Sequence, residues 1–183
     1  MNGKDVKSIL ITALSLFLIC AVAAGALAYV NSVTAPTIAA NNAAAADKAR
    51  SEVLPAADGF DEKNASDGTV YYVGKSGDDA VGYVFTTSAK GYGGDVEIMT
   101  GVDAEGKVTG VSILTINETP GLGMNAKKDD FRQQYVGKSG ELAVNKDGGE
   151  IVAITSATVT SRAVTKAVNE ALSLYESIAG KGE

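Results

Sequence analysis

Residues 95–114 read DVEIMTGVDAEGKVTGVSIL. Two runs rich in β-branched and apolar residues, Asp95–Val102 and Val108–Leu114, lie on either side of the polar segment 103–107. Two such runs joined by a few residues that include Asp and Gly are typical of a β-hairpin. We therefore predict two strands connected by a hairpin turn at residues 103–107.

The segments before this hairpin continue the same pattern. Val70–Val73 and Val81–Thr87 are short β-type runs separated by Gly and Asp. Successive short strands of this kind form an antiparallel sheet, and such a sheet needs cover on at least one apolar face. We expect a helix to provide that cover.

Two helices are predicted after the sheet. Residues 127–135 favour a short helix with Phe131 and Tyr135 on one face, four positions apart. Residues 161–178 carry apolar side chains at helical spacing, with Thr160 or Ser161 available as the cap and Gly180 as the stop. The predicted fold class is α+β, an antiparallel sheet with flanking helices, in a domain over residues 58–183.

The segment Ile9–Val30 has no charged residue and shows no polar face. As a helix with a rise of about 1.5 Å per residue, it spans the roughly 30 Å hydrocarbon core of a bilayer. Lys4 and Lys7 precede it, and the next basic residue is Lys48. The positive-inside rule predicts a single-pass protein of the cell membrane, embedded in lipid, with residues 1–8 in the cytoplasm and the domain on the extracytoplasmic side.

The alternative for this segment is a cleaved signal peptide, since Ala26-Leu27-Ala28 fits a small-x-small cleavage site. The apolar run is long for a signal peptide, which favours a retained transmembrane helix. Residues 31–57 then favour a helical stalk. Pro36 suits the first turn of this stalk helix, and Pro55 stops it after Leu54.

Charge and composition exclude several functions. Without Lys4, Lys7 and Asp5, the chain has 14 basic and 21 acidic residues, which opposes nucleic-acid binding. The sequence has no His, and its single Cys lies in the apolar segment, so we expect no metal site and no Ser-His-Asp or Cys-His catalytic group. Redox chemistry would require an organic cofactor.

Five hydroxyl residues occur within residues 155–161, TSATVTS, directly before the C-terminal helix. Ser and Thr gather at helix starts because their oxygens satisfy free N–H groups. The same helix end also favours a bound phosphate, since its N–H groups and dipole attract negative charge. Arg162 in the first turn could add a bidentate contact. From the residues alone, a helix cap and a phosphate site both stay open.

The run Thr155-Ser156-Ala157-Thr158, followed by Val159-Thr160-Ser161-Arg162, resembles the flavinylation motif of the FMN-binding domain in RnfG, a component of the Rnf ion-translocating electron transport complex, and in its relative NqrC. In that family the threonine that closes the tetrad carries FMN by a phosphoester bond, installed by a separate flavin transferase that uses FAD. The resemblance makes Thr158 the acceptor, with Thr155, Ala157 and Thr160 beside it. Ser156 stands where the family usually has Gly, and a positive φ would be costly for it.

A second match lies at residues 118–123, ETPGLG, which resembles a loop that lines the flavin in the family. Pro120 fixes a turn, and Gly121 and Gly123 permit close approach of the backbone to a flat ring. A tight turn alone would also explain this pattern. The turn 91–94, GYGG, resembles the family's GYxG turn before a strand, and Tyr92 either packs near the flavin or is an ordinary aromatic residue of the turn. The implied cofactor-binding residues of this loop and turn are Glu118, Thr119, Gly121, Leu122, Gly123 and Tyr92.

The resemblance covers nearly the whole chain in the expected order, and its length suits RnfG better than the longer NqrC. It implies an electron-transfer subunit of a membrane-bound ion-translocating ferredoxin:NAD oxidoreductase, with other Rnf proteins as partners and no catalytic residue of its own. Two alternatives are a flavinylated carrier of another extracytoplasmic respiratory system and a non-redox membrane-anchored binding module. The last of these predicts no bound flavin.

Overall fold

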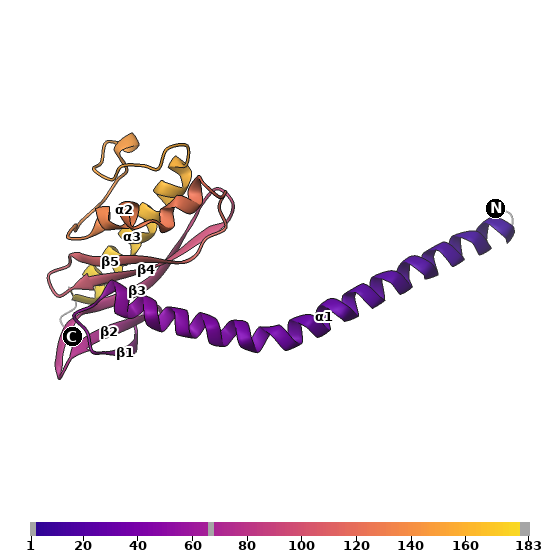
Figure 1. Cartoon of the computed structure of the whole chain (residues 1–183), viewed down its shortest axis with the longest axis horizontal. Coiled ribbons are helices and arrows are strands. Elements are labelled where there is room, and N and C mark those ends of the chain that lie inside the picture. The colour runs from indigo at the N-terminus through magenta and orange to yellow at the C-terminus, as the bar shows by residue number, and fades with distance from the viewer. Residues whose placement is uncertain (1–2, 66–67, 180–183) are drawn as a thin grey trace. The chain divides into compact units, whose positions relative to one another are not determined.

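The computed structural model describes residues 3–65 and 68–179. The described residues form two compact units, which divide between residues 44 and 45. The first two residues of the predicted tail and the expected stop at Gly180 lie outside the described residues. The first unit is the N-terminal part of one long helix, α1 (Gly3–Val53) (Figure 1).

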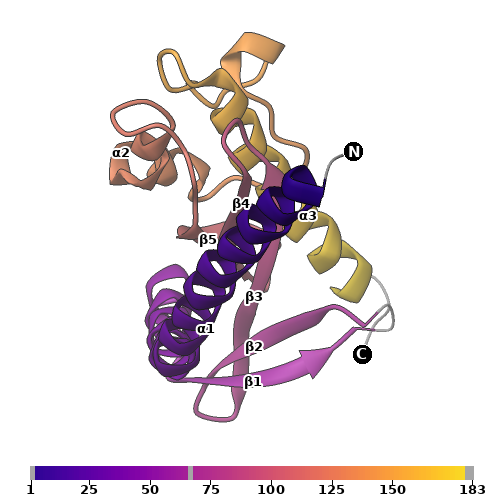
Figure 2. The same ribbon diagram turned by 90° about the vertical axis from the view of Figure 1, so that its right-hand side faces the viewer.

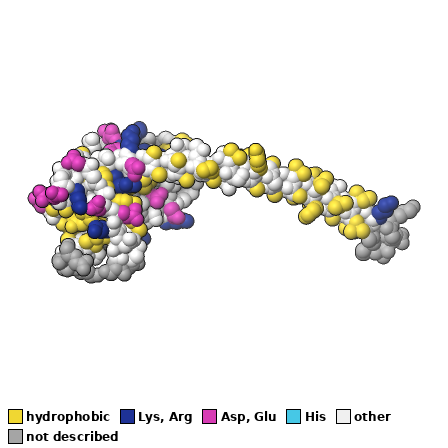
Figure 3. Space-filling model, turned by 90° about the horizontal axis from the view of Figure 1, so that it is seen from below, with side chains coloured by type: hydrophobic (Ala, Val, Ile, Leu, Met, Phe, Trp, Pro, Cys, Tyr) yellow, Lys and Arg dark blue, Asp and Glu magenta, His cyan; other side chains and the backbone are white. Residues whose placement is uncertain are grey.

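Helix α1 is apolar along the predicted membrane segment. Its most apolar 18-residue window has a mean hydropathy of 2.5, and none of that window is buried by protein. Figure 3 shows hydrophobic side chains distributed along this helix. Leu18 and Ile19, for example, are 62% and 65% exposed. Helix α1 is therefore long and apolar enough to cross a membrane, as the sequence predicts.

The prediction that Pro36 begins a separate helix is wrong, because Pro36 lies inside α1. Proline cannot donate the backbone hydrogen bond to Ser32, four residues earlier. The alanine-rich sequence after it and the apolar sequence before it both favour helix, so the chain stays helical across this one lost bond. Helix α1 ends at Val53, and the expected stop at Leu54 and Pro55 is confirmed.

The second unit contains a five-stranded antiparallel sheet with the order β1-β2-β3-β4-β5. The strands are β1 (Gly59–Asn64), β2 (Val70–Ser76), β3 (Asp79–Lys90), β4 (Asp95–Asp103) and β5 (Val108–Thr115). The last four contain the predicted runs; β4 and β5 are each one residue longer than predicted, whereas β2 and β3 extend further, to Ser76 and over Asp79–Lys90. Strand β1 was not predicted, because its sequence GFDEKN has one large apolar residue, Phe60, and lies almost wholly exposed at the edge of the sheet.

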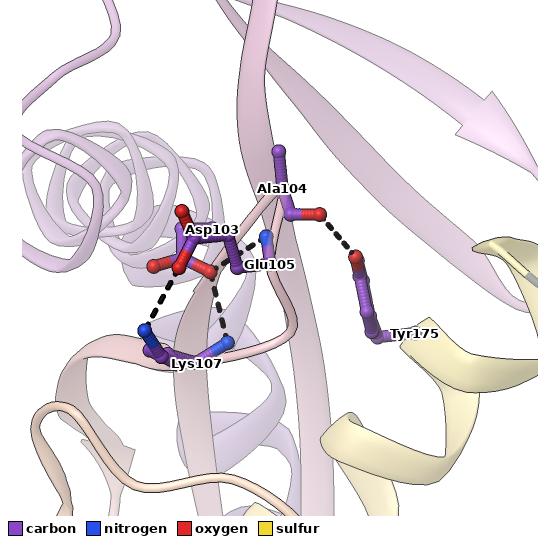
Figure 4. Close-up of polar contacts among 5 residues, drawn as sticks. All are labelled: Asp103, Ala104, Glu105, Lys107 and Tyr175. Atoms are coloured by element: carbon purple, nitrogen blue, oxygen red, sulfur yellow. Dashed lines mark hydrogen bonds and ion pairs between the residues drawn. The ribbon is translucent and has the colours of Figure 1, made fainter.

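The turn between β4 and β5 lies at residues 103–107, as predicted. One carboxylate oxygen of Asp103 accepts hydrogen bonds from the amides of Glu105 and Lys107, both at 2.9 Å (Figure 4). The hydroxyl of Tyr175, from the C-terminal helix, donates to the carbonyl of Ala104 at 2.7 Å. The hairpin turn is thus fixed both by Asp103 within it and by Tyr175 of the C-terminal helix.

Helix α3 (Thr158–Ala179) covers one face of the sheet and lies along β3 and β4 (Figure 2). Its buried residues Val164, Ala167 and Val168 pack with Phe85 and Ile98 of these strands in the main core. The helix begins three residues earlier than predicted. The reason is that Thr160 and Ser161 are buried in its first turn and do not cap it from outside.

The other face of the sheet is covered by the last turns of α1, which belong to the same compact unit. Val53 and Leu54 lie on a row of glycines that crosses four strands. An added Cβ atom at Gly101 or Gly110 would overlap the backbone of Val53, and one at Gly74 would overlap the side chain of Leu54. The absence of side chains along this row lets the helix end approach the sheet closely.

Between β5 and α3 the chain forms short helical turns. These are η1 (Gly123–Lys127), α2 (Asp129–Arg132), η2 (Gln133–Tyr135) and η3 (Asn145–Asp147). The single helix predicted for residues 127–135 is thus divided into pieces, yet Phe131 and Tyr135 do share one face. Both are buried, and their rings meet edge to face with centroids 5.7 Å apart.

Candidate functional site

A cavity of about 550 Å³ lies at the start of α3. It is lined by three segments that are distant in the sequence: the turn at residue 92, the loop at residues 118–123 and the start of α3 at residues 156–160. Nine of the twelve predicted cofactor-binding residues contribute to its wall. They are Tyr92, Glu118, Thr119, Leu122, Gly123, Ser156, Ala157, Thr158 and Thr160.

Thr158 is the first residue of α3 and is half-buried in the cavity wall. In the described part of the chain, the backbone amides of Thr158, Val159 and Thr160 have no hydrogen-bond acceptor; the helical ladder begins with the amide of Ser161, which donates to Ala157 at 3.0 Å. The free amides and the helix dipole together favour an anion next to the hydroxyl of Thr158.

The turn before Thr158 places Ser156 in a backbone conformation that glycine adopts more easily. The amide of Ala157 donates to the carbonyl of Ile154 at 3.0 Å, so residues 154–157 form a β-turn. Ser156, the third residue of this turn, has φ +60° and is the one non-glycine residue in the described ranges with a positive φ. A type II turn requires a positive φ at this position, and glycine adopts it at no steric cost.

Ser161 connects this turn to the helix. Its buried hydroxyl accepts a hydrogen bond from the amide of Ile154 at 2.9 Å and donates one to the carbonyl of Ala157 at 3.0 Å. The hydroxyl of Thr165, one turn further along, donates to the carbonyl of Ser161 at 2.9 Å. Because its single proton is used there, the hydroxyl of Tyr135 must be the donor in its 2.8 Å contact with Thr165.

The loop at residues 118–123 contains a second turn of the same kind. The amide of Leu122 donates to the carbonyl of Thr119 at 3.1 Å, Pro120 occupies the second position, and Gly121 occupies the third with φ +78°. Gly121 therefore serves the turn itself and does not line the cavity. Gly123 does line the cavity, and an added Cβ atom there would lie 2.7 Å from the hydroxyl oxygen of Thr160.

Two other predicted residues lie outside the cavity wall. Thr155 is exposed in the turn before α3. Arg162 forms a bidentate ion pair with Asp147, with nitrogen–oxygen distances of 2.7 and 2.6 Å. This guanidinium holds the pKa of the Asp147 carboxyl below its usual range. A phosphate contact by Arg162 therefore stays a prediction, and in this structure the guanidinium is committed to a carboxylate.

Residues 91–173 match the family model described as FMN-binding domain, and residues 1–53 match the model described as RnfG N-terminal region. The G subunit of the Na(+)-translocating ferredoxin:NAD(+) oxidoreductase complex of Acetobacterium woodii is 42% identical over 197 aligned residues, which cover 95% of both chains. This chain belongs to the RnfG family.

A second relative in the RnfG family has nearly the same length. The G subunit of the proton-translocating ferredoxin:NAD(+) oxidoreductase complex of Clostridium ljungdahlii is 36% identical over 98% of both chains. The names of these two relatives differ in the translocated ion, so membership of the RnfG family does not determine the ion for this chain.

Two solved structures have a similar fold. The C subunit of the Na(+)-translocating NADH-quinone reductase from Parabacteroides distasonis superimposes with a TM-score of 0.51 and 23% identity, covering 60% of this chain and 62% of the other. NqrC of Shewanella oneidensis gives 0.50 and 17% identity, covering 65% and 67% of the two chains. These similarities support the sheet and helix arrangement of the RnfG domain.

One wall residue of this RnfG domain was not predicted. Val159 lines the cavity and is 46% exposed. Val159 is the second residue of a helix that starts at Thr158, and the direction of its side chain is set by that helix. Its place in the cavity wall could therefore not be predicted while α3 was expected to start at Ser161. With Tyr92 and Leu122, which are 79% and 41% exposed, it gives the cavity an apolar rim.

Proposed function

We propose that this chain is the electron-transfer subunit of a membrane-bound ion-translocating ferredoxin:NAD oxidoreductase, and that it carries FMN through a phosphoester on Thr158. The observation that carries this proposal is the position of Thr158. Its hydroxyl-bearing side chain is half-buried in a cavity wall, at the first residue of a helix whose leading amides have no acceptor among the described residues.

The residues of the cavity fit FMN. A volume of about 550 Å³ lies within the range of roughly 300–1,000 Å³ that is usual for small-ligand sites. Tyr92, Leu122 and Val159 offer apolar and aromatic surface to a flat ring, and the free amides of α3 offer donors to a phosphate. When bound, the flavin supplies the electron-accepting chemistry that none of these side chains has.

The charges of the site favour a covalent attachment. Among the described residues that line the cavity there is no lysine or arginine, and Arg162 is paired with Asp147. A free FMN phosphate would depend on helix amides alone for compensation of its charge. An ester to Thr158 removes one ionisable oxygen of the phosphate and makes retention independent of any cation. The bond forms when the Thr158 hydroxyl displaces AMP from FAD and gives up its proton.

The surrounding chain supports this role for Thr158. The β-turns at residues 119–122 and 154–157 fix the two loops of the cavity. The hydroxyl of Ser161 bonds the β-turn at residues 154–157 to the start of α3. These contacts position Thr158 beside the free amides of the helix. Helix α1 anchors this domain in the membrane, and from the lysines at its start we expect the domain outside the cytoplasm.

Partners follow from membership of the RnfG family. A carrier with no nicotinamide-binding motif exchanges electrons with other proteins, which we expect to be the remaining membrane components of the Rnf complex. A flavin transferase is required for maturation. The chain is thus a redox subunit and not a stand-alone catalyst.

The proposal is tested by expressing the full chain with a flavin transferase and reading in-gel flavin fluorescence after denaturation. We expect fluorescence from the wild type and none from Thr158→Val. Thr155→Val is the matched control, since this exposed residue lies outside the cavity wall and should leave the signal intact. A wild type without signal, or a Thr158→Val variant that keeps it, contradicts the proposed attachment.

A further inference from the structure

Glu118 places a buried carboxylate in the wall of the cavity. Its residue is 9% exposed, although the cavity itself is open to solvent on one side. One carboxylate oxygen accepts a hydrogen bond from the backbone amide of Tyr92 at 2.7 Å. This bond ties the turn at residues 91–94 to the loop at residues 118–123, so the same side chain joins two of the three segments that form the cavity.

The carboxylate has little freedom to move. An added Cβ atom at Gly91 would overlap the oxygen that accepts the Tyr92 amide, and one at Gly123 would lie 2.8 Å from the other oxygen. Backbone glycines therefore lie against both oxygens of Glu118 where other residues would displace them. The negative charge is therefore held at one place in the cavity wall.

No cation neutralises this carboxylate within the described part of the chain. Glu118 forms none of the ion pairs found between described residues, and the residues that line the cavity with it are polar or apolar but not basic. A buried charge acts more strongly on its surroundings than an exposed one, because less water screens it.

We propose that Glu118 is a positioning and tuning residue that holds the reduction potential of the bound flavin at a more negative value. Reduction adds negative charge to the ring, and a fixed carboxylate in the same cavity raises the cost of that charge. A low potential suits a carrier that works between ferredoxin and NAD. This inference rests on the proposed function, because it requires that FMN occupies the cavity.

The first test compares Glu118→Gln with the wild type as full-length, flavinylated chains in detergent. Glutamine keeps the shape of the side chain and an oxygen that accepts the Tyr92 amide, but it removes the charge. Spectroelectrochemical titration should show a midpoint potential shifted to a more positive value. Glu141→Gln is the matched control: it removes one charge from an exposed residue of another loop, and its potential should equal that of the wild type.

A second pair of variants covers the case in which Glu118→Gln does not fold. Leu122 lines the same cavity and is 41% exposed, so Leu122→Lys adds a cation to the wall without removing a buried group. Its potential should be more positive than that of Leu122→Gln, which has a similar polarity and no charge. An unchanged potential in a folded Glu118→Gln would overturn the tuning role. If that variant does not fold, equal potentials in Leu122→Lys and Leu122→Gln would overturn it, because a charge in this wall would then not reach the flavin. If the wild type carries no flavin, the proposed function itself has failed, so the two failures are distinguishable.

Discussion

Replacing Ser156 with glycine should stabilise the FMN-binding domain. Ser156 has φ +60° in the turn before α3, and its exposed side chain makes no hydrogen bond in the described structure. The left-handed conformation costs a non-glycine residue about 1–2 kcal/mol. Glycine loses about 0.5–1 kcal/mol more conformational entropy on folding. The difference between these two costs predicts a gain of about 0.5–1 kcal/mol for Ser156→Gly.

The measurement is urea unfolding of the full chain in detergent, produced without a flavin transferase so that no cofactor contributes. Near-UV circular dichroism of the sheet tyrosines, such as Tyr71 and Tyr83, reports on the packed domain. In a thermal melt, the expected gain corresponds to a rise in melting temperature of about 1–4 °C. Gly140→Ser is the control for the reverse substitution, because Gly140 also has a positive φ, +71°, and has open space around its Cβ position. It should lose about 1 kcal/mol.

A lower stability for Ser156→Gly would refute this reasoning. It would mean that the serine side chain makes a contact that outweighs the strain of its backbone. The same variant also separates strain from recognition: if glycine raises stability and leaves the extent of flavinylation unchanged, the transferase accepts either residue at this turn position.

Three further predictions concern the core, the response to pH and the membrane topology. Gly101→Ala should lower the free energy of unfolding by about 1–3 kcal/mol in the same urea assay, because the new methyl group overlaps the Val53 carbonyl; an unchanged value would show that α1 does not need this close approach. Burial raises the pKa of the Tyr135 phenol above its unfolded value of about 10, so its contribution to stability is complete below pH 10 and is lost as the pH rises through the folded pKa. Tyr135→Phe should remove this part of the alkaline loss of stability, which is at most about 1.4 kcal/mol per pH unit. Equal slopes of unfolding free energy against pH in the variant and the wild type would contradict the role of Tyr135. In a Cys20→Ala background, Ser139→Cys should react with a membrane-impermeant maleimide in intact spheroplasts, and labelling only after lysis would reverse the proposed orientation.

Much of the fold could be predicted from local sequence alone. The strands of the sheet follow from alternating β-branched runs, and the turn at residues 103–107 follows from its Asp and Gly. Strand β1 could not be predicted in this way, because an exposed edge strand made of charged residues has no apolar pattern. The packing of Val53 and Leu54 on the second face of the sheet could not be predicted either. The glycines that allow it lie on separate strands and form a row only after the strands pair.

The candidate site, like the fold, could be predicted only in part. The residues of the cavity wall were predictable as motifs, and the structure brings nine of them together. Their individual tasks were not predictable, because these depend on contacts between distant segments. Glu118 is fixed by the amide of residue 92, and Arg162 is turned to a carboxylate fifteen positions earlier. The start of α3 also had to be known before Val159 could be placed on the rim.

Site-resolved mass spectrometry tests the attachment of FMN to Thr158 most directly. Trypsin should release residues 147–162 as one peptide, which contains Thr158 together with the other four hydroxyl residues of the cluster. From the chain produced with a flavin transferase, this peptide should carry an added mass of about 440 Da, that of FMN less water. Fragment ions should place that mass on Thr158. An unmodified peptide, or a mass on Thr155, Ser156, Thr160 or Ser161, would contradict this attachment.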